Sequence, residues 1–167
     1  RLNKVFTQGL TEEVGYCIPI QAHKGQWRTG RWFLRDERMY LIPGDSAMGY
    51  RLPLDSQPWV AKKDYPYTIP ADPFAPPAAA RVALQKPGSI AGKTAVADDT
   101  APVMKESATH IVRTAMCVQV RNGQLYVFMP PLESLDDYLE LVARIEDTAQ
   151  AMNQPVVMEG YTPPRDA

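Results

Sequence analysis

Residues 113–129 carry the hydrophobic pattern of a β-hairpin. Two strand-like runs, 113–120 and 125–129, flank Asn122-Gly123, a dipeptide that strongly favours a two-residue type I′ turn. Such a turn creates three cross-strand pairs on one apolar face: Val120 with Leu125, Val118 with Val127, and Met116 with Met129. The opposite face is mixed and comprises Arg113, Ala115, Cys117, Gln119, Tyr126 and Phe128. We predict that the apolar face packs in the core and the mixed face is available for binding.

The pattern changes to a helical period after Pro130-Pro131 and predicts a helix over residues 135–152. Ser134 suits the N-cap and Asp137 stands in capping-box position, while Asn153 suits the C-terminal end. The apolar stripe comprises Leu135, Tyr138, Leu139, Val142, Ile145, Ala149 and Met152. Residues 156–158 then form a strand, so residues 113–159 are predicted to be a β-β-α-β unit.

The N-terminal part is predicted to contain shorter elements. Residues 1–10 suit a short helix, and 14–20 suit a strand at a sheet edge, because Pro19 lacks the N–H that a central strand needs. Residues 27–42 predict a second hairpin around Asp36-Glu37, with Leu34 facing Met39 and Trp32 facing Leu41. Asp-Glu is a poor type I′ turn, so a longer loop with a shifted register stays open. The predicted class is α+β with a mainly antiparallel sheet.

The chain divides into three parts by composition. Residues 1–60 are β-rich, and residues 110–167 hold the β-β-α-β unit. Residues 61–109 contain seven of the 16 prolines and twelve alanines, which predicts a long loop or partly disordered insert with one short helix near 78–84. The chain begins at Arg1 without a methionine, and we expect it to be a piece of a larger protein.

Charge and composition exclude several functions. The net charge is −1, which argues against nucleic acid or anionic lipid as an obligatory partner. No apolar run reaches the roughly 18 residues of a spanning helix, and the first residues lack the apolar core of a signal peptide, so a reducing cytoplasm is expected. Cys17 and Cys117 are predicted to be small buried hydrophobes in strands, and His23 and His110 to be exposed or hydrogen-bonded.

Three stretches together resemble a known family: RWFLRDERMYLIPGDSAMGYRLPLDSQPW, RTAMCVQVRNGQLYVFMPPLESLDDYLELV and PVVMEGYTPPRD. They look like the domain named putative amidoligase in large bacterial transglutaminase-like proteins. The resemblance covers about residues 1–60 and 111–167 and carries no pattern for the insert. It implies a sheet related to glutamine synthetase and glutamate–cysteine ligase, incomplete in this chain.

The resemblance implies ATP- and Mg²⁺-dependent ligation of a carboxylate to an amine, with a peptide or amino acid as substrate. Glu159 is the candidate for metal binding or proton transfer, because it follows a predicted buried strand and precedes a glycine turn. Candidates for binding phosphate or substrate are Arg31, Asp45, Ser46, Arg51, Arg113 and Arg165, and Gln119 and Tyr126 are expected to line the cleft. Gln119 stands where many relatives are expected to carry Glu, so either it is no metal ligand or part of the site is lost.

A second hypothesis is a non-catalytic scaffold or peptide-binding module that serves a transglutaminase-like domain elsewhere in a longer protein. The proline-rich insert and Gln119 favour it. In either case we expect this piece to be inactive alone and to act with the remaining domains of the longer protein.

Overall fold

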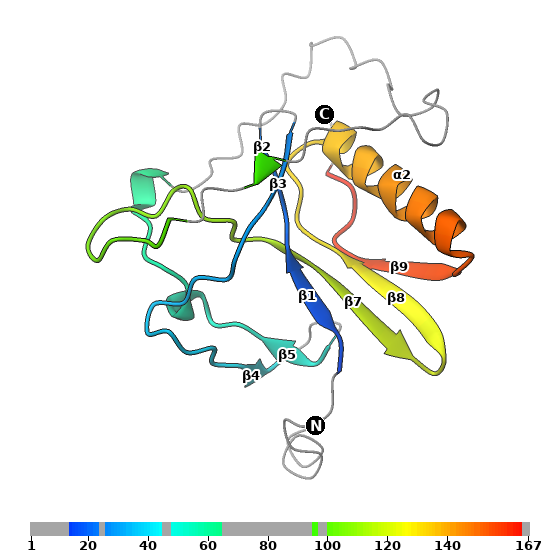
Figure 1. Ribbon diagram of the computed structural model, residues 1–167, viewed down its shortest axis with the longest axis horizontal. Coiled ribbons are helices and arrows are strands. Elements are labelled where there is room, and N and C mark those ends of the chain that lie inside the picture. The colour runs from blue at the N-terminus through cyan, green and yellow to red at the C-terminus, as the bar shows by residue number, and fades with distance from the viewer. Residues whose placement is uncertain (1–13, 24–25, 45–47, 65–94, 97–99, 165–167) are drawn as a thin grey trace.

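The computed structural model describes residues 14–23, 26–44, 48–64, 95–96 and 100–164. Several predictions fall outside these residues: the short helices at 1–10 and 78–84, and the candidate residues Asp45, Ser46 and Arg165. The described part has sheets of mostly antiparallel strands and one long helix, which confirms the α+β class (Figure 1).

The main sheet has four strands in the order β1-β7-β8-β9. They are β1 (Tyr16–Pro19), β7 (Ala115–Arg121), β8 (Gln124–Met129) and β9 (Val156–Gly160). The β7–β8 hairpin turns at Asn122-Gly123, where both residues have positive φ, and it pairs Val118 with Val127 and Val120 with Leu125 as predicted. β1 is an edge strand, as Pro19 indicated, and β9 runs parallel to β8 after the helical crossover.

Helix α2 (Leu135–Met152) packs on one face of this sheet, as Figure 1 shows. Its predicted ends are confirmed: Ser134 Oγ accepts a hydrogen bond of 3.1 Å from the Asp137 N–H, and Asn153 closes the helix at φ 49°. The predicted stripe was partly wrong, because the most buried helix residue, Leu141, was not part of it, and Met152 is 68% exposed. The helix presents Tyr138, Leu141, Val142 and Ile145 to the sheet residues Val127 and Met129.

A second sheet has the order β2-β3-β6. It comprises β2 (Gln21–His23), β3 (Gln26–Thr29) and β6 (Ala95–Val96), with β3 antiparallel to β2 and parallel to β6. Trp27 of β3 is buried in the same core cluster as Val127 and Leu141. This sheet therefore packs against the core of the main sheet.

The hairpin predicted over residues 27–42 was wrong. A turn does form at Asp36-Glu37, where the Glu37 N–H donates to the Leu34 carbonyl and Glu37 has φ 55°. The chain beyond it does not pair back, because both edges of β3 are occupied by β2 and β6. Residues 39–42 are consequently exposed, and only β4 (Ile42–Pro43) pairs, with β5 (Tyr50–Arg51).

The loop between β4 and β5 is closed by a hydrogen bond of 2.9 Å from the Gly44 N–H to the Gly49 carbonyl. Two 3₁₀ turns follow, η1 (Leu54–Ser56) and η2 (Lys62–Asp64), and η1 confirms the turn expected near Asp55-Ser56. Ser56 and Gln57 are buried, and the Ser56 carbonyl accepts from the Arg35 N–H.

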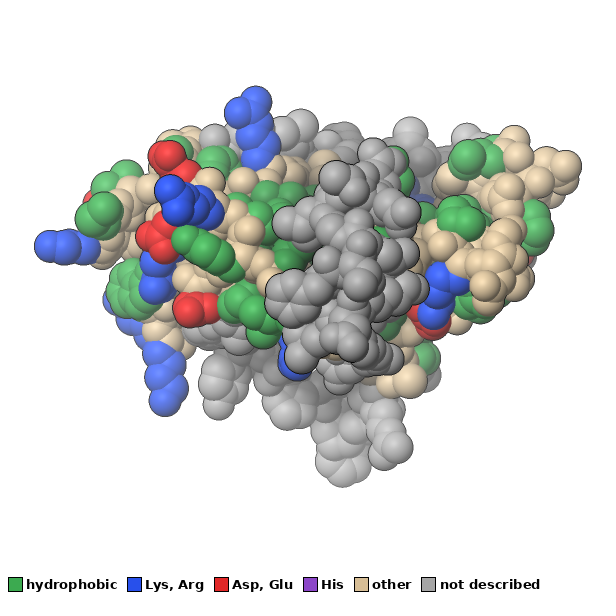
Figure 2. Space-filling view, turned by 90° about the horizontal axis from the view of Figure 1, so that it is seen from below, with side chains coloured by type: hydrophobic (Ala, Val, Ile, Leu, Met, Phe, Trp, Pro, Cys, Tyr) green, Lys and Arg blue, Asp and Glu red, His purple; other side chains and the backbone are tan. Residues whose placement is uncertain are grey.

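Within the described residues, no helix combines the length and apolar character that crossing a membrane requires. On the face shown in Figure 2, both charge signs occur among hydrophobic side chains. This mixture agrees with the small net charge of the chain.

Candidate functional site

The candidate site is the face of the main sheet opposite α2. Because side chains alternate along a strand, Gln119, Tyr126 and Glu159 point away from the face that packs Val127 and Met129 on the helix. The pairing register aligns one row across all four strands: Cys17, Cys117, Phe128 and Glu159. Gln119 and Tyr126 lie in the next row. The mixed face that the hairpin pattern predicted is therefore extended by Glu159 on β9.

Arg121 lies across this face. It starts on β7, its guanidinium stacks 3.7 Å from the centre of the Tyr126 ring on β8, and its Nη2 atom is 2.5 Å from Oε1 of Glu159 on β9. The Nη2 atom is therefore paired with the Glu159 carboxylate, whereas the buried Nε atom has no hydrogen-bond partner among the described residues. Arg121 thus brings one unused donor, its Nε–H group, to the face.

Gln119 brings an unused acceptor to the same face. Its Oε1 atom is buried and has no hydrogen-bond partner among the described residues. A buried polar atom without a partner costs on the order of 1–3 kcal/mol, so such atoms in native proteins point to a bound water, ion or ligand. Gln119 and Arg121 are two residues apart on one strand, which places an unused acceptor and an unused donor on one surface.

Gly160 holds the strand that carries Glu159 close to β8. It has φ +105°, and a Cβ atom there would lie 2.7 Å from the backbone nitrogen of Met129 and 2.8 Å from its oxygen. Only glycine fits this conformation and this approach. The next residue, Tyr161, makes an edge-on ring contact with Phe128 at 6.2 Å between centroids, so the segment that follows Glu159 is held against β8.

Comparison with family models gives one match, over residues 1–167, to a family described as "Putative amidoligase enzyme (DUF2126)". The chain belongs to this amidoligase family. The match also runs through residues 61–109, for which the sequence resemblance carried no pattern. Comparison with curated proteins and with solved structures gave no match.

The arginines proposed from the amidoligase resemblance lie on other elements. Arg113 precedes β7, and its Nη2 donates to the carbonyls of Pro58 at 2.7 Å and Ala108 at 3.2 Å. Arg51 lies in β5 beside Gly44, and Arg31 is exposed after β3. Of the candidate residues, the structure brings together Gln119, Tyr126 and Glu159.

Arg121 is the residue of this candidate face that sequence reasoning missed. Its Nη2 atom pairs with Glu159, whereas Arg165, which was a candidate for binding phosphate or substrate, lies outside the described residues. The signal was present, because Arg121 is two residues beyond Gln119 and a strand places such residues on one face.

The cysteines differ from the prediction. Both lie in strands, but Cys17 is exposed and Cys117 is half-buried, so they are not small core residues. Their sulfur atoms are 3.6 Å apart across the β1–β7 pair. The prediction for His110 is confirmed, since its Nε2 atom lies 3.1 Å from the Thr100 carbonyl in a hydrogen bond.

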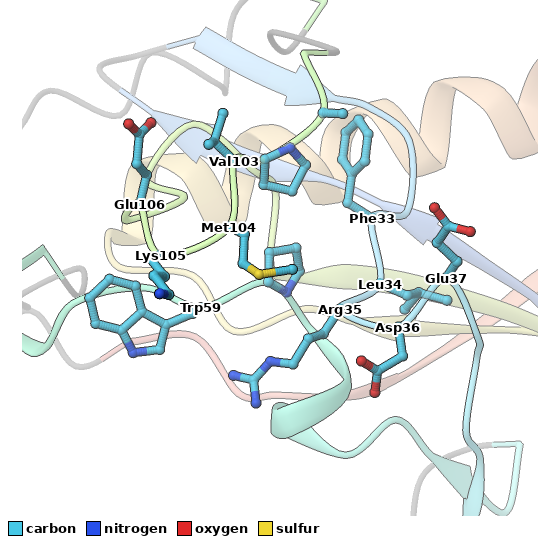
Figure 3. Close-up of a pocket in the computed structure, with 13 residues that line it drawn as sticks. Phe33, Leu34, Arg35, Asp36, Glu37, Trp59, Val103, Met104, Lys105 and Glu106 are labelled. Atoms are coloured by element: carbon cyan, nitrogen blue, oxygen red, sulfur yellow. The ribbon is translucent and has the colours of Figure 1, made fainter.

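Two cavities lie away from the Arg121–Glu159 pair. One, of about 460 Å³, lies between the turn at 33–37 and the loop at 101–106, with Pro58 and Trp59 in its wall; Figure 3 shows the side chains of the two segments. The other, of about 280 Å³, is lined by Arg113, His23 and Asp137 among others. Within the described part of the chain, no three His, Cys, Asp or Glu side chains gather in a way that could hold a metal ion.

Proposed function

We propose that this chain takes part in forming an amide bond between a carboxylate and an amine, and that the sheet face opposite α2 binds the reactants. The family match supports the ligase chemistry. The single structural observation that carries the site is the presence of two buried polar atoms without hydrogen-bond partners on one face: Gln119 Oε1 and Arg121 Nε.

In this proposal, Arg121 binds the anionic reactant. Its buried Nε–H donor suits an oxygen atom of a carboxylate or phosphate, because guanidinium groups form strong hydrogen bonds with such anions. The ring of Tyr126 stacks on the guanidinium group of Arg121 and limits its orientations. The result is a fixed positive group where an acyl phosphate would carry negative charge.

Gln119 binds the amine in this proposal. An amide oxygen accepts hydrogen bonds, and the N–H groups of an attacking amine are the complementary donors. Gln119 therefore suits a role as substrate ligand, which favours the alternative that this position is no metal ligand. An amide oxygen is also a weaker ligand than a carboxylate for Mg²⁺.

The proposed cofactors are ATP and Mg²⁺. Glu159 is the carboxylate of this face, and a magnesium ion that arrives with a nucleotide takes one or two protein carboxylates together with phosphate oxygens and water. Glu159 fits this donor requirement. The nucleotide would supply the phosphoryl group that activates the carboxylate, and the residues of this face would orient the two reactants.

The acid and the amine are proposed to be amino acids or peptides, and the chain is proposed to act with a transglutaminase-like domain. Neither the residues of the face nor the cavities select one acid over another. Arg31, Arg51 and Arg113 remain proposed contacts for substrate or phosphate, with Asp45, Ser46 and Arg165 as further proposed contacts.

A direct test measures release of phosphate from ATP with Mg²⁺ in the presence of a panel of amino acids, peptides and amines. It is carried out on this chain and on a longer protein that contains it. Glu159→Gln is expected to lower turnover by about a hundredfold or more if the carboxylate holds metal or moves a proton. Arg121→Ala is expected to raise the KM of the acid.

The matched control is Glu140→Gln. Glu140 pairs with Arg144 on α2 at 2.5 Å with similar exposure, but this pair lies on the helix and away from the sheet face. The control variant should retain the turnover of the unmodified chain. Absence of nucleotide-dependent product in both proteins would overturn the proposal. An equal loss of turnover in the Glu140 and Glu159 variants would show that the sheet face is not the site of the reaction.

A second candidate function is peptide binding without catalysis, and the 460 Å³ cavity favours it. Its wall combines Phe33 and Trp59 with charged groups of both signs, including Arg35 and Glu106. Trp59 is 50% exposed, and exposed tryptophans are common anchors in peptide recognition. Trp59→Ala should weaken peptide binding in this case, and no nucleotide-dependent product is expected from either protein.

A further inference from the structure

Cys17 and Cys117 form a directly opposed pair across β1 and β7, although a hundred residues separate them in the chain. Their sulfur atoms are 3.6 Å apart. Cys17 is exposed and Cys117 half-buried, so small reagents in solution can reach the pair. Both lie on the sheet face that also carries Glu159, in the same cross-strand row.

The register places the two cysteines at a narrow position of the antiparallel ladder, that is, at a pair whose Cα atoms lie closer together than those of the neighbouring pairs. Ile20 and Thr114 are opposed, and the Ile20 N–H donates to the Thr114 carbonyl at 3.0 Å, so they form a hydrogen-bonded pair. Hydrogen-bonded and non-hydrogen-bonded pairs alternate, which makes Pro19–Ala115 and Cys17–Cys117 non-hydrogen-bonded pairs. Pro19 agrees with this assignment, because it has no N–H to donate.

A second contact supports the same assignment. At a non-hydrogen-bonded position of an edge strand the carbonyl points away from the neighbouring strand, and the Cys17 carbonyl accepts a hydrogen bond of 3.3 Å from Trp32 Nε1 instead. Non-hydrogen-bonded pairs have Cα atoms about 4.5 Å apart. Disulfides span Cα distances of about 4.4–6.8 Å, so the two strands are already close enough for a bond between these sulfurs.

The two thiols are also unequal in acidity. The hydrogen bond from the Cys17 thiol lowers the pKa of Cys117, and the same hydrogen bond together with burial raises the pKa of Cys17. Either thiol can donate this hydrogen bond, and the hydrogen bond stabilises the thiolate that accepts it. The thiolate is the nucleophilic form of cysteine, so the hydrogen bond favours reaction of the pair.

We propose that Cys17 and Cys117 are a reversible thiol–disulfide site that reacts with low-molecular-weight disulfides such as glutathione disulfide. The thiolate of one cysteine attacks one sulfur of the reagent, forms a mixed disulfide and releases one thiolate. The other cysteine then loses its proton and attacks the sulfur of the first, which forms the protein disulfide and releases the second thiolate. The two protein thiols lose two electrons, and the reagent gains them as two free thiols.

Through this disulfide, the redox state of the solution would act on the candidate binding face. The bond ties the edge strand β1 to β7, two residues from Gln119 and in the row of Glu159. A bond between residues this far apart in the chain restricts the unfolded state strongly. We therefore expect the oxidised protein to unfold at a higher temperature than the reduced protein.

The test incubates the folded protein with glutathione disulfide, blocks free thiols, and digests the denatured protein with trypsin without reductant. The expected product is a disulfide between the peptides 5–24 and 114–121, with two glutathione molecules released per chain and reversal by dithiothreitol. Cys17→Ser and Cys117→Ser should each stop at a mixed disulfide. Unmodified protein that retains a mixed disulfide, or does not react, would overturn the proposal.

A matched control places a cysteine pair at the neighbouring register. Tyr16→Cys with Val118→Cys, in a background with both native cysteines changed to Ser, puts the thiols at a hydrogen-bonded pair of the same two strands. This pair should form its disulfide more slowly than the native pair. Equal rates would show that the narrow position is not what favours the reaction, and would overturn the geometric basis of the assignment.

Discussion

Arg121 lies across three strands and is the residue on which the candidate site depends most. Its stem starts on β7, the guanidinium covers Tyr126 on β8, and the charged end reaches Glu159 on β9. The side chain is about one-third exposed, so its ion pair is partly screened by water. A residue that contributes little stability but keeps a buried Nε–H donor without a hydrogen-bond partner fits a binding role better than a structural one.

This reasoning predicts that Arg121→Ala lowers the free energy of unfolding by no more than about 1–2 kcal/mol, because exposed ion pairs and cation–π contacts are weak. Urea denaturation checks the value, and a double-mutant cycle with Glu159→Gln isolates the pair. Arg144→Ala, which removes the similar pair on α2, is the control. A loss of more than about 3 kcal/mol would make Arg121 a structural residue.

The pKa of Cys117 leads to a prediction on reactivity. Because the hydrogen bond from Cys17 lowers this pKa, Cys117 should be alkylated by iodoacetamide at lower pH than an ordinary cysteine. Cys17→Ala removes the donor, so the pKa of Cys117 rises and its alkylation profile shifts to higher pH. The measurement is the rate of Cys117 modification against pH in both proteins. Coincident profiles would contradict the assigned direction.

The elements that were predicted well are those whose signals are local. Asn122-Gly123 specifies the β7–β8 turn, and Ser134 and Asn153 specify the ends of α2, each through bonds to residues at most four positions away. The hairpin at 27–42 failed because β3 pairs with β6, which lies far along the chain. The Cys17–Cys117 pair could not be predicted for the same reason, since nothing near either cysteine specifies the register between β1 and β7.

The N-cap of α2 allows a test at this scale. Ser134→Ala removes the hydroxyl that accepts from the Asp137 N–H, and we expect a loss of about 1 kcal/mol in the free energy of unfolding. Thr148→Ala is the matched control, because it removes an exposed hydroxyl that bonds to the Arg144 carbonyl within the helix. The control should change stability by less than about 0.5 kcal/mol. Urea titrations of both variants provide the comparison.

The end of β9 allows a second test. Gly160→Ala places a Cβ atom against the backbone of Met129 in addition to straining a positive φ, so we expect a loss of about 2–4 kcal/mol. Gly123→Ala shares the positive φ but meets no atom within 4 Å, and should lose about 1–2 kcal/mol. Equal losses in urea denaturation would show that the approach to Met129 is not what requires glycine.

At the scale of the whole molecule, one core joins the two larger sheets and the helix. Trp27 comes from β3, Val127 and Met129 come from β8, and Leu141 and Ile145 come from α2. The candidate face lies on the other side of the same strands, since alternate residues of β8 point to the core and to Arg121. The position of the site therefore depends on packing behind it, to which all three elements contribute.

Leu141 tests this dependence, because it is 3% exposed and belongs to the cluster that joins the three elements. Leu141→Ala leaves a cavity between α2 and β8, and we expect a loss of about 2–5 kcal/mol in the free energy of unfolding. Met152→Ala is the control on the same helix; Met152 is 68% exposed, and its loss should stay within about 0.5 kcal/mol. Urea denaturation followed by both circular dichroism and tryptophan fluorescence checks the values. If the helix signal and the tryptophan signal change at the same urea concentration in both variants, the core is one cooperative unit. If Leu141→Ala loses the helix signal alone, Trp27 and α2 belong to separate cores. In that case the sheet holds the candidate face without the helix.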